Sequence, residues 1–562
     1  METFQLSGID ITVMLVYAVF IIAYGLYMGK RESSEEYFLG GRSMTWPIVG
    51  ISLFAANISS STLVGLAGDA YKTNVHVYNY EWLAVVVLVF FAMFFMPFYL
   101  KSGVYTMPEF LERRYDSRSR YYFSFITIIG NVIIDTAAGL YVGMLVLKIV
   151  FPEMETWVII VMLAFAAAAY TIPGGLSSVI HTEVIQAILL VIGSCILTYY
   201  CYDAVGGWDA LVSKLEGMKG TKPVMDKTPD EIFSLVRPIG SVDYEGGEFM
   251  SWRGLLLGAP ILGFYFWANN QFMVQRVLSA KNLNHGRWGA LFAGLLKLPV
   301  LFIMVLPGVF AIVMFSDLDL TNLNYGDCDN LADCPNMTYP VLLFQLLPSG
   351  ILGLVLAGLL AAMMSSASAT FNSASTLITM DFIQKANPNL TSKQLVRVGQ
   401  IATLVLVVLA SLWAPQIERF GSLFQYLQLV LAFICPPVVA VFVLGLFWKK
   451  ATADGAFASL MVGFFFAIFL LLSGMLELSE TINNIHFLDR AVLLFIICFL
   501  VHVGVSLITA PSSEAVLANY TWKSSIWTEE TAELAELPWY QNYRILSVIL
   551  LIITAVIVGM WW

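Results

Sequence analysis

Charged residues are scarce in this sequence of 562 residues: they make up 12% of the chain, whereas ordinary globular domains contain about 25%. Such a low share excludes a soluble enzyme of three or four domains. Because 59% of the residues are hydrophobic and no glycine repeat is present, a disordered or collagen-like chain is excluded too. The class that remains is an all-α protein that crosses a lipid bilayer many times.

A surplus of positive charge is missing as well, since the formal net charge is −10, and we expect no nucleic-acid partner. The six cysteines are too few for a disulfide scaffold and show no zinc spacing. Cys328 and Cys334 share one polar loop, which allows a disulfide between them. No Walker A motif, arginine-rich voltage sensor or potassium-filter motif is present, so we predict neither an ATP-driven pump nor an enzyme.

Long apolar runs are the main feature of the sequence. A spanning helix needs about 20 mostly apolar residues, and on this criterion the sequence predicts fourteen. The predicted spans are 8–28, 46–70, 77–101, 120–150, 154–173, 182–204, 253–275, 288–316, 340–380, 396–414, 420–447, 453–473, 489–510 and 542–562. The ninth is long enough to extend past the bilayer or to tilt strongly.

The positions of lysine and arginine predict the orientation. Most of the 29 basic residues lie in or beside the odd-numbered loops. Several of those on the other side lie in the long 205–252 loop, whose charges have little influence on orientation because long loops cross the membrane regardless of charge. The odd-numbered loops are therefore expected in the cytoplasm, with both termini outside. We predict a multi-pass protein of the plasma (inner) membrane; the pattern says nothing about oligomeric state.

Two spans are interrupted by residues that disfavour a continuous helix. The second contains the run AANISSST at 55–62. The seventh contains Gly258, Pro260 and Gly263, followed by Trp267, Asn269, Asn270 and Gln271. Irregular backbone at membrane depth is tolerated only where it lines a cavity or is buried in protein. Two broken helices five spans apart are typical of an inverted five-helix repeat; two unrelated kinks are the alternative. The predicted units are an extra N-terminal helix and loop (1–45), a first repeat (46–252), a second repeat (253–450) and three extra helices (451–562).

Three ionisable residues lie inside spans, where charge is costly and by default marks a pathway: Glu81, Asp135 and Lys297. A Glu/Lys pair around a polar substrate would neutralise both charges, because a carboxylate accepts and an ammonium donates hydrogen bonds. A structural ion pair between two helices is the alternative. Gln425 and Gln428 lie one turn apart in the eleventh span, where their amides suit either a sugar hydroxyl or contacts between helices.

The ninth span carries small hydroxyl residues, Ser365 and Ser366, in its middle. Hard cations prefer oxygen ligands. These hydroxyls, together with free carbonyls of an unwound second span, would give about five ligands for Na⁺. Close packing of small residues between helices is the alternative.

Several motifs together resemble the sodium/solute symporter family, and within it the sodium/glucose cotransporter branch. They keep their order along nearly the whole chain. The motifs are YFLGGRS at 37–43, AANIS at 55–59, YEW at 80–82, GGLSSV at 174–179 with Thr182, Glu183 and Gln186, QR at 275–276, LSAK at 278–281, NSAS at 372–375, MD at 380–381 and GLFWKK at 445–450.

This resemblance implies a LeuT-type fold with fourteen helices and two binding sites. The implied sodium ligands are carbonyls of Ala55, Ile58 and Ala362 and hydroxyls of Ser365 and Ser366, with a possible second sodium at Glu183 and Ser368. The implied sugar site contains Asn57, Glu81, Lys297 and Gln428, lies beside Trp267, and is closed on the outer side by Tyr80 and Phe424.

The chain departs from the galactose-transporting branch of the family at four sugar-facing or gating positions. Thr62, Ala84, Gly263 and Phe266 are smaller or have fewer polar atoms, so the substrate is expected to differ from galactose. Asp135 is an additional acid that could bind a pair of hydroxyls or pair with Lys297. We therefore predict a sodium-coupled symporter that imports a monosaccharide or polyol by alternating access.

Two other functions remain as alternatives at this level. One is a symporter of the same fold for an organic acid such as sialate or a sugar acid. A carboxylate substrate should meet an arginine near the midplane, and the predicted spans contain none there. The other is a solute sensor or channel that keeps the fold without transporting.

Overall fold

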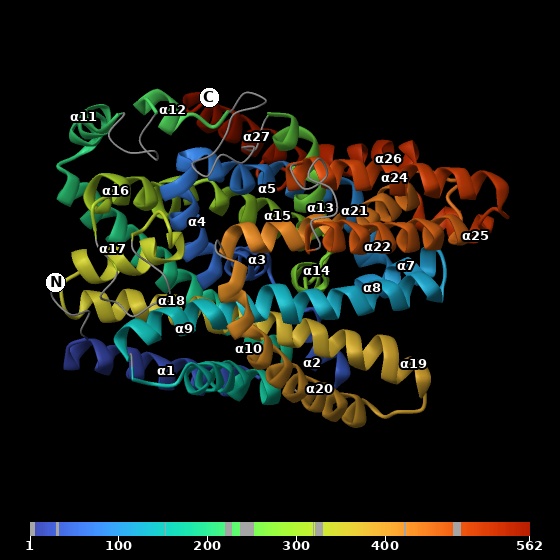
Figure 1. Cartoon of the computed structure of the whole chain (residues 1–562). Helices are drawn as coiled ribbons and strands as arrows, with labels where there is room; N and C mark the ends of the chain where they lie inside the picture. The colour runs from blue at the N-terminus through green and yellow to red at the C-terminus, as the bar shows by residue number, and fades with distance from the viewer. Residues whose placement is uncertain are drawn as a thin grey trace.

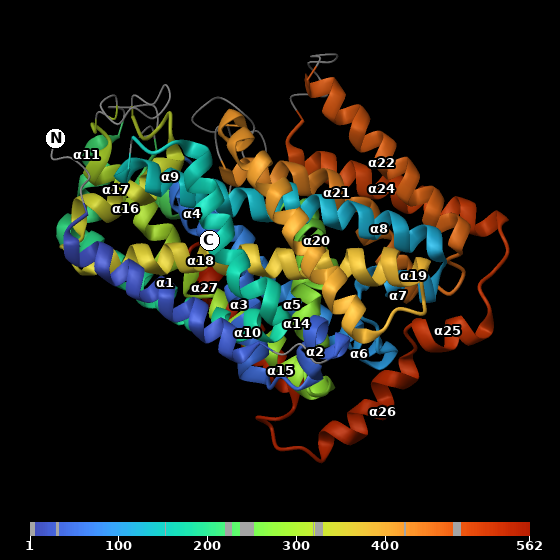
Figure 2. The same cartoon turned by 90° about the horizontal axis from the view of Figure 1, so that it is seen from below.

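The computed structural model describes residues 6–29, 33–151, 153–219, 227–236, 252–318, 320, 330–420, 423–475 and 485–562. Across these residues the chain is helical and no strand is present. The long helices run side by side along one direction and form an elongated bundle (Figures 1 and 2). The all-α prediction is therefore confirmed.

Most predicted spans correspond to one helix or to a chain of helical pieces without a break. The single helices are α1 (Gly8–Met28), α20 (Ser392–Trp413), α21 (Leu423–Phe447), α22 (Ala453–Met475), α24 (Phe487–Ile508) and α27 (Tyr543–Met560). The third span is α5 (Asn79–Phe90), η3 (Phe91–Phe95) and α6 (Met96–Ser102), and the fourth is α8 (Ser117–Gly130), η4 (Asn131–Thr136) and α9 (Ala137–Val150).

The second and seventh spans are broken, as the sequence predicts. The second consists of α3 (Trp46–Asn57) and α4 (Ser60–Thr73), and the two residues between these helices are non-helical. The seventh consists of η6 (Gly254–Gly258), α13 (Ala259–Phe264) and η7 (Tyr265–Asn269), and it stops at Asn270 before α14 (Gln271–Leu278) begins. The interruption of the seventh span therefore lies C-terminal to its glycines and proline, at the asparagine pair.

The fifth and sixth spans are two helices, as predicted, and they meet within α10 (Thr156–Val205) at a kink at Gly175, where φ is +60° and ψ is −160°. Two other spans differ in detail from the prediction. The eighth bends by 43° between α15 (Leu283–Lys297) and the pair η8 (Leu301–Val305) and α16 (Leu306–Phe315). The ninth is not one long helix, because α17 (Thr338–Leu346) ends before α18 (Ile351–Leu377) begins. Helices η11 (Ile378–Ile383) and α19 (Gln384–Ala386) continue α18.

No other residue fits at Gly175, where α10 bends. Its positive φ is unfavourable for any side chain, and an added Cβ would lie 2.5 Å from the carbonyl oxygen of Tyr37. Length and composition identify ten helices in the described part of the chain that could span a membrane, or eleven if the bent pair is counted as one span. The shorter apolar helices Trp46–Asn57 and Gly254–Asn269 belong to the broken spans. The figure of fourteen stays a prediction.

Shorter helices lie between and beside the spans. They are α2 (Ser34–Leu39), η1 (Gly40–Arg42), η2 (Asn74–Tyr78), α7 (Met107–Arg114), α11 (Trp208–Met218), α12 (Pro229–Phe233), η10 (Pro335–Met337), η12 (Ala414–Phe420), α25 (Glu514–Tyr520) and α26 (Ser524–Ala535). Cys334 is disulfide-bonded, while Cys328, its predicted partner, lies outside the described residues. Both described chain ends lie at the end of the bundle that carries α11 and α12 (Figure 1), and Leu235 donates its amide to the carbonyl of Trp561.

The connection 511–541 folds back onto the bundle through α26. Glu530 accepts hydrogen bonds from Tyr543 and Arg544 and forms an ion pair with Arg287. Burial by itself would raise the pKa of the Glu530 carboxyl, but the charge of Arg287 and these hydrogen bonds outweigh it, so that the pKa lies below its usual value. The segment is thus attached to the transmembrane helices and is not a separate domain.

The N-terminus of α18 is capped by a side chain from α1. One carboxylate oxygen of Asp10 accepts the amides of Gly350 and Gly353, both at 2.7 Å. We expect Asp10→Ala to lower stability by about 1–2 kcal/mol, the usual value of a helix cap, and to lower the thermal unfolding midpoint of the purified protein. Asp10→Asn keeps an acceptor oxygen and should lose less; equal losses in both variants would contradict the capping role.

Candidate functional site

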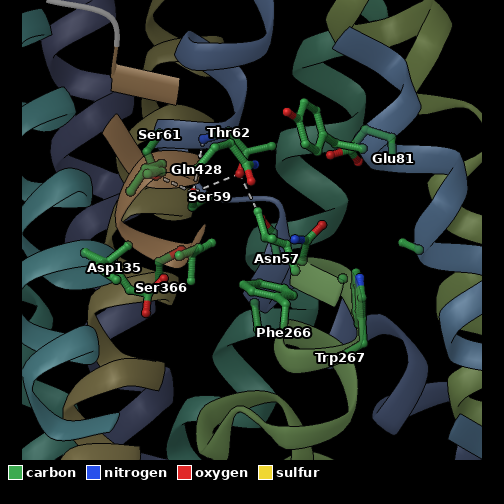
Figure 3. A pocket seen from close by; sticks show the side chains of 18 of the residues that line it. Asn57, Ser59, Ser61, Thr62, Glu81, Asp135, Phe266, Trp267, Ser366 and Gln428 are labelled. Atoms are coloured by element: carbon green, nitrogen blue, oxygen red, sulfur yellow. Dashed lines mark hydrogen bonds between the residues drawn. The ribbon is translucent and has the colours of Figure 1, made fainter. Parts of the chain in front are cut away.

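A pocket lies where the broken second span meets five other elements. Its walls come from the α3–α4 break, α5, η4, the α13–η7 segment, α18 and α21 (Figure 3). The lining residues are Ala56, Asn57, Ser59, Ser61, Thr62, Tyr80, Glu81, Leu83, Ala84, Ile134, Asp135, Ala259, Leu262, Gly263, Phe266, Trp267, Phe272, Ser366, Thr370, Leu427, Gln428 and Leu431. Residues predicted for the substrate and for sodium thus share one cavity.

Polar side chains explain how the second span breaks. Ile58 has φ −83° and ψ 81°, outside the helical region, and Ser59 is extended. The Ser59 hydroxyl accepts the amide of Thr62 at 3.1 Å and so caps α4, while the Thr62 hydroxyl donates to the Asn57 carbonyl at 2.9 Å. A helix end leaves its last carbonyls without partners in the next turn. The break thereby frees backbone oxygens around Ala55 and Ile58, as the predicted sodium site requires.

Two buried hydroxyls lie on α18, which packs against both α3 and α4. Ser365 and Ser366 are 1% and 5% exposed, and neither hydroxyl has a hydrogen-bond partner within the described part of the chain. In contrast, Ser368 donates to the Met364 carbonyl at 2.7 Å. A buried polar group without a partner costs about 1–3 kcal/mol, so these two hydroxyls are available to contact a ligand in the pocket.

The donor set suits Na⁺ better than a transition metal. Ala362, the third predicted carbonyl ligand, is buried one turn before Ser366 on α18. No group of three or more His, Cys, Asp or Glu side chains able to hold a metal occurs in the described ranges. Hydroxyls and carbonyls are hard, neutral oxygen ligands, the type that alkali and alkaline-earth cations prefer.

On the other side of the pocket, the predicted charges form a pair. Lys297 makes an ion pair with Glu81 and donates a hydrogen bond to the side-chain oxygen of Asn57. Its ammonium lies 5.8 Å from the centre of the Trp267 ring. Lys297 is 1% exposed and Glu81 6% at the side chain. Three residues from three different spans, 240 positions apart at most, are therefore brought together as the sequence predicts.

Aromatic rings form much of the remaining wall. Phe266 packs edge-on against Trp267 with the ring centres 5.4 Å apart, and Tyr80 and Phe272 also line the pocket. Gly263 and Ala84, which have no polar side-chain atoms, also line the pocket. Gln428 faces the pocket from α21. The side chains of Phe424 and Gln425, both predicted for this site, lie outside the described residues.

Asp135 lies in η4, a π-helical turn, and lines the pocket opposite Glu81 (Figure 3). Lys297 binds Glu81, so the structure does not show the predicted alternative of an Asp135–Lys297 pair. Sequence reasoning did not single out Thr370, although it lies one turn after Ser366 on α18 and also lines the pocket. The helical spacing of four residues was the available signal.

The candidate second sodium residues are engaged elsewhere. Glu183 forms a buried ion pair with Arg276 and accepts a hydrogen bond from Ser52. The hydroxyls of Ser368 and Tyr170 are hydrogen-bonded to each other at 2.6 Å. The sequence pattern contained Arg276 in a motif but did not identify it as the partner of Glu183, because 93 residues separate them.

Broken helices around a central pocket of paired charges, buried hydroxyls and aromatic rings define a membrane transporter. A family model described as "Sodium:solute symporter family" matches residues 37–463. The chain is 34% identical over 560 residues to sodium/glucose cotransporter 4 of Danio rerio, covering 95% of this chain and 84% of that protein. It is also 34% identical over 540 residues to sodium/myo-inositol cotransporter 2 of Oryctolagus cuniculus, covering 91% and 78%. The chain therefore belongs to the sodium:solute symporter family and is a multi-pass membrane protein.

Solved structures share the fold at low identity. A Na⁺-coupled sialic acid symporter in a substrate-bound outward-open state gives a TM-score of 0.73 at 21% identity, covering 90% of this chain and 99% of that one. A nucleobase-cation-symport-1 family transporter in a closed conformation gives 0.52 at 12% identity, covering 87% and 98%. Both are LeuT-type transporters, so the predicted fold type is confirmed.

Proposed function

We propose that this chain is a symporter that uses the sodium gradient to import a monosaccharide or polyol by alternating access. Relatives named for glucose and myo-inositol cotransport, each about one third identical over nearly the whole chain, support this substrate class. The observation that carries the proposal is the position of Asn57. Its side chain is bonded to Lys297 in the pocket, and its backbone belongs to the break beside Ser365 and Ser366.

In the proposed sugar site, the Glu81 carboxylate accepts hydrogen bonds from sugar hydroxyls, while the Lys297 ammonium donates hydrogen bonds to hydroxyl oxygens. Asn57 and Gln428 can do both, because an amide is donor and acceptor at once. Trp267 and Phe266 offer aromatic faces to the apolar side of a sugar ring or cyclitol, and Tyr80 and Phe424 are proposed to close the outer side. Thr62, Gly263 and Gln425 complete the proposed lining.

In the proposed sodium site, carbonyls of Ala55, Ile58 and Ala362 and hydroxyls of Ser365 and Ser366 bind the ion as cargo. The ion would fix the broken backbone and with it the orientation of Asn57. A ligand shifts an equilibrium only through its different affinity for the two states, so sodium and sugar strengthen each other's binding reciprocally. The membrane potential adds about 2.3 kcal/mol per charge per 100 mV.

The charge of the pocket argues against an organic acid as substrate. A carboxylate needs a cation that is available for pairing, but Lys297 is already bound to Glu81, and no arginine is among the described residues that line the pocket. Asp135 would repel the acid. A neutral substrate with several hydroxyls fits these groups better.

The finer organisation belongs to the same proposal. We propose fourteen spans in the plasma (inner) membrane with both termini outside, and two inverted repeats at 46–252 and 253–450 between the flanking parts 1–45 and 451–562. A second sodium at Glu183 and Ser368 would require Glu183 to exchange its contact with Arg276 for the ion, and therefore belongs to a different step of the cycle.

Replacing Na⁺ by K⁺ tests the coupling directly. Proteoliposomes that contain the purified protein should accumulate the transported sugar or cyclitol against its gradient when Na⁺ is outside, and at least tenfold less with K⁺. A thermal-shift screen of monosaccharides and polyols with NaCl or KCl identifies the substrate first, because a ligand that binds the folded state raises its stability. Equal accumulation in both salts would contradict the proposal; equilibration without accumulation would indicate a channel.

A further inference from the structure

The charges around the pocket do not cancel. Two carboxylates line it, those of Glu81 and Asp135, and one ammonium, that of Lys297, lies behind it. The ammonium is paired with Glu81. Asp135 has neither an ion pair nor a hydrogen bond to any residue that the structure describes. With both carboxylates ionised, the pocket carries one net negative charge in excess, located at Asp135.

Asp135 lies on the same side of the pocket as the proposed sodium site. Its neighbour Thr136 is hydrogen-bonded to Thr370 on α18 at 2.5 Å, hydroxyl to hydroxyl. Ser366 lies four residues before Thr370, which is about one helical turn of 5.4 Å. Asp135, Ser366 and Thr370 all line the cavity, and Figure 3 shows Asp135 and Ser366 next to each other, away from Glu81 and Trp267.

The local backbone supports a specific role for this position. Residues Asn131–Thr136 form a π-helical turn inside an otherwise α-helical span. Such turns change the direction of the side chains that follow and occur frequently at functional sites. A charged side chain within a span is costly and needs a compensating charge. The described surroundings of Asp135 contain no such charge, and a neutral sugar brings none.

We propose that Asp135 is the counter-charge of the transported sodium ion. This inference rests on the proposed function, because it assumes that Na⁺ binds at Ser365 and Ser366. The five proposed ligands are all neutral, so the ion's charge has to be balanced from outside the ligand shell. In a medium of low dielectric constant, a carboxylate near the shell attracts the cation strongly without touching it.

The counter-charge also accounts for tight coupling. With Na⁺ bound, the charges of Glu81, Lys297, Asp135 and the ion sum to zero, and the loaded pocket can close in the low-dielectric interior. With sugar alone, Asp135 remains unbalanced, and closure carries the cost of burying a charge without a partner. Asp135 thus disfavours transport of sugar without sodium, and it acts as a positioning residue for the ion.

The test measures sodium binding without sugar. Purified protein in detergent is titrated with NaCl at constant ionic strength, with choline chloride as the replacement salt, and the midpoint of thermal stabilisation is recorded. Asp135→Asn, which keeps the shape and removes the charge, should raise the sodium midpoint at least tenfold. Asp135→Glu keeps the charge and should stay within about threefold of the original protein. Asp454→Asn removes a carboxylate at the start of α22, outside the pocket, and should change nothing.

A second measurement separates this role from sugar recognition. At saturating Na⁺, Asp135→Asn should bind sugar as tightly as the original protein, and its proteoliposomes should show more sugar flux without sodium. An unchanged sodium midpoint in Asp135→Asn would overturn the proposal. So would weaker sugar binding at saturating Na⁺ with an unchanged midpoint, which would make Asp135 a sugar ligand. If the original protein itself shows no Na⁺-specific stabilisation, the proposed function fails, and not only the role of Asp135.

Discussion

Replacement of Lys297 by alanine should reduce sodium-driven sugar uptake at least a hundredfold. The change leaves the Glu81 carboxylate buried without its cation and removes a donor from the pocket. Breaking a buried ion pair by removing one partner costs about 3–5 kcal/mol, and every 1.4 kcal/mol corresponds to a factor of ten. Uptake into proteoliposomes under a fixed sodium gradient measures the loss. Glu81→Gln should have a comparable effect, because it leaves the ammonium unbalanced.

A purely structural ion pair would produce the same losses through misfolding, and a double variant separates the two explanations. Glu81→Gln with Lys297→Met removes both charges together, so no unpaired charge remains and folding should recover. If the pair binds sugar, the double variant should show normal size-exclusion behaviour and sodium-dependent stabilisation, yet no sugar-dependent stabilisation. Restored uptake in the double variant would leave only the structural role for this pair.

The sequence predicted the break in the second span and the residues around it. Five polar residues within 55–62 stand out in an apolar run, because serine and asparagine side chains compete for backbone hydrogen bonds. In the structure, this competition is visible as the Ser59 cap on Thr62 and the bond from Thr62 to the Asn57 carbonyl. The Glu81–Lys297 pair was predictable for a related reason: charges inside spans need partners, and few candidates exist in so apolar a chain.

Features that depend on long-range packing were beyond the local pattern. The ninth span looked continuous because α17 and α18 are both apolar; the cap from Asp10, 340 residues away, marks the start of α18. Glu183 appeared available for a second sodium because the residues near it in the sequence do not indicate that Arg276 is its ion-pair partner. In each case the deciding contact joins residues that are remote in the sequence.

Alanine at Ser366 should have opposite effects on stability and on sodium binding. In buffer without Na⁺, Ser366→Ala removes a buried hydroxyl that has no hydrogen-bond partner among the described residues, so the protein should unfold at the same temperature as the original or higher. In the presence of Na⁺, the variant lacks a ligand and should lose most of the sodium-dependent stabilisation. We expect the sodium concentration for half-maximal uptake to rise at least tenfold. Thermal unfolding with and without NaCl, together with uptake at varied sodium, measures both effects.

Ser373→Ala is the matched control, because it makes the same change two turns further along α18. The Ser373 hydroxyl accepts a hydrogen bond from the side-chain amide of Asn131 at 2.9 Å, and both groups are buried. Its loss leaves that amide without an acceptor and should lower stability by about 1–3 kcal/mol with or without sodium. The sodium dependence of uptake should stay the same. If Ser366→Ala instead lowers stability equally in both salts and keeps its sodium dependence, the hydroxyl serves packing within α18, and the sodium site has to be sought elsewhere around the α3–α4 break.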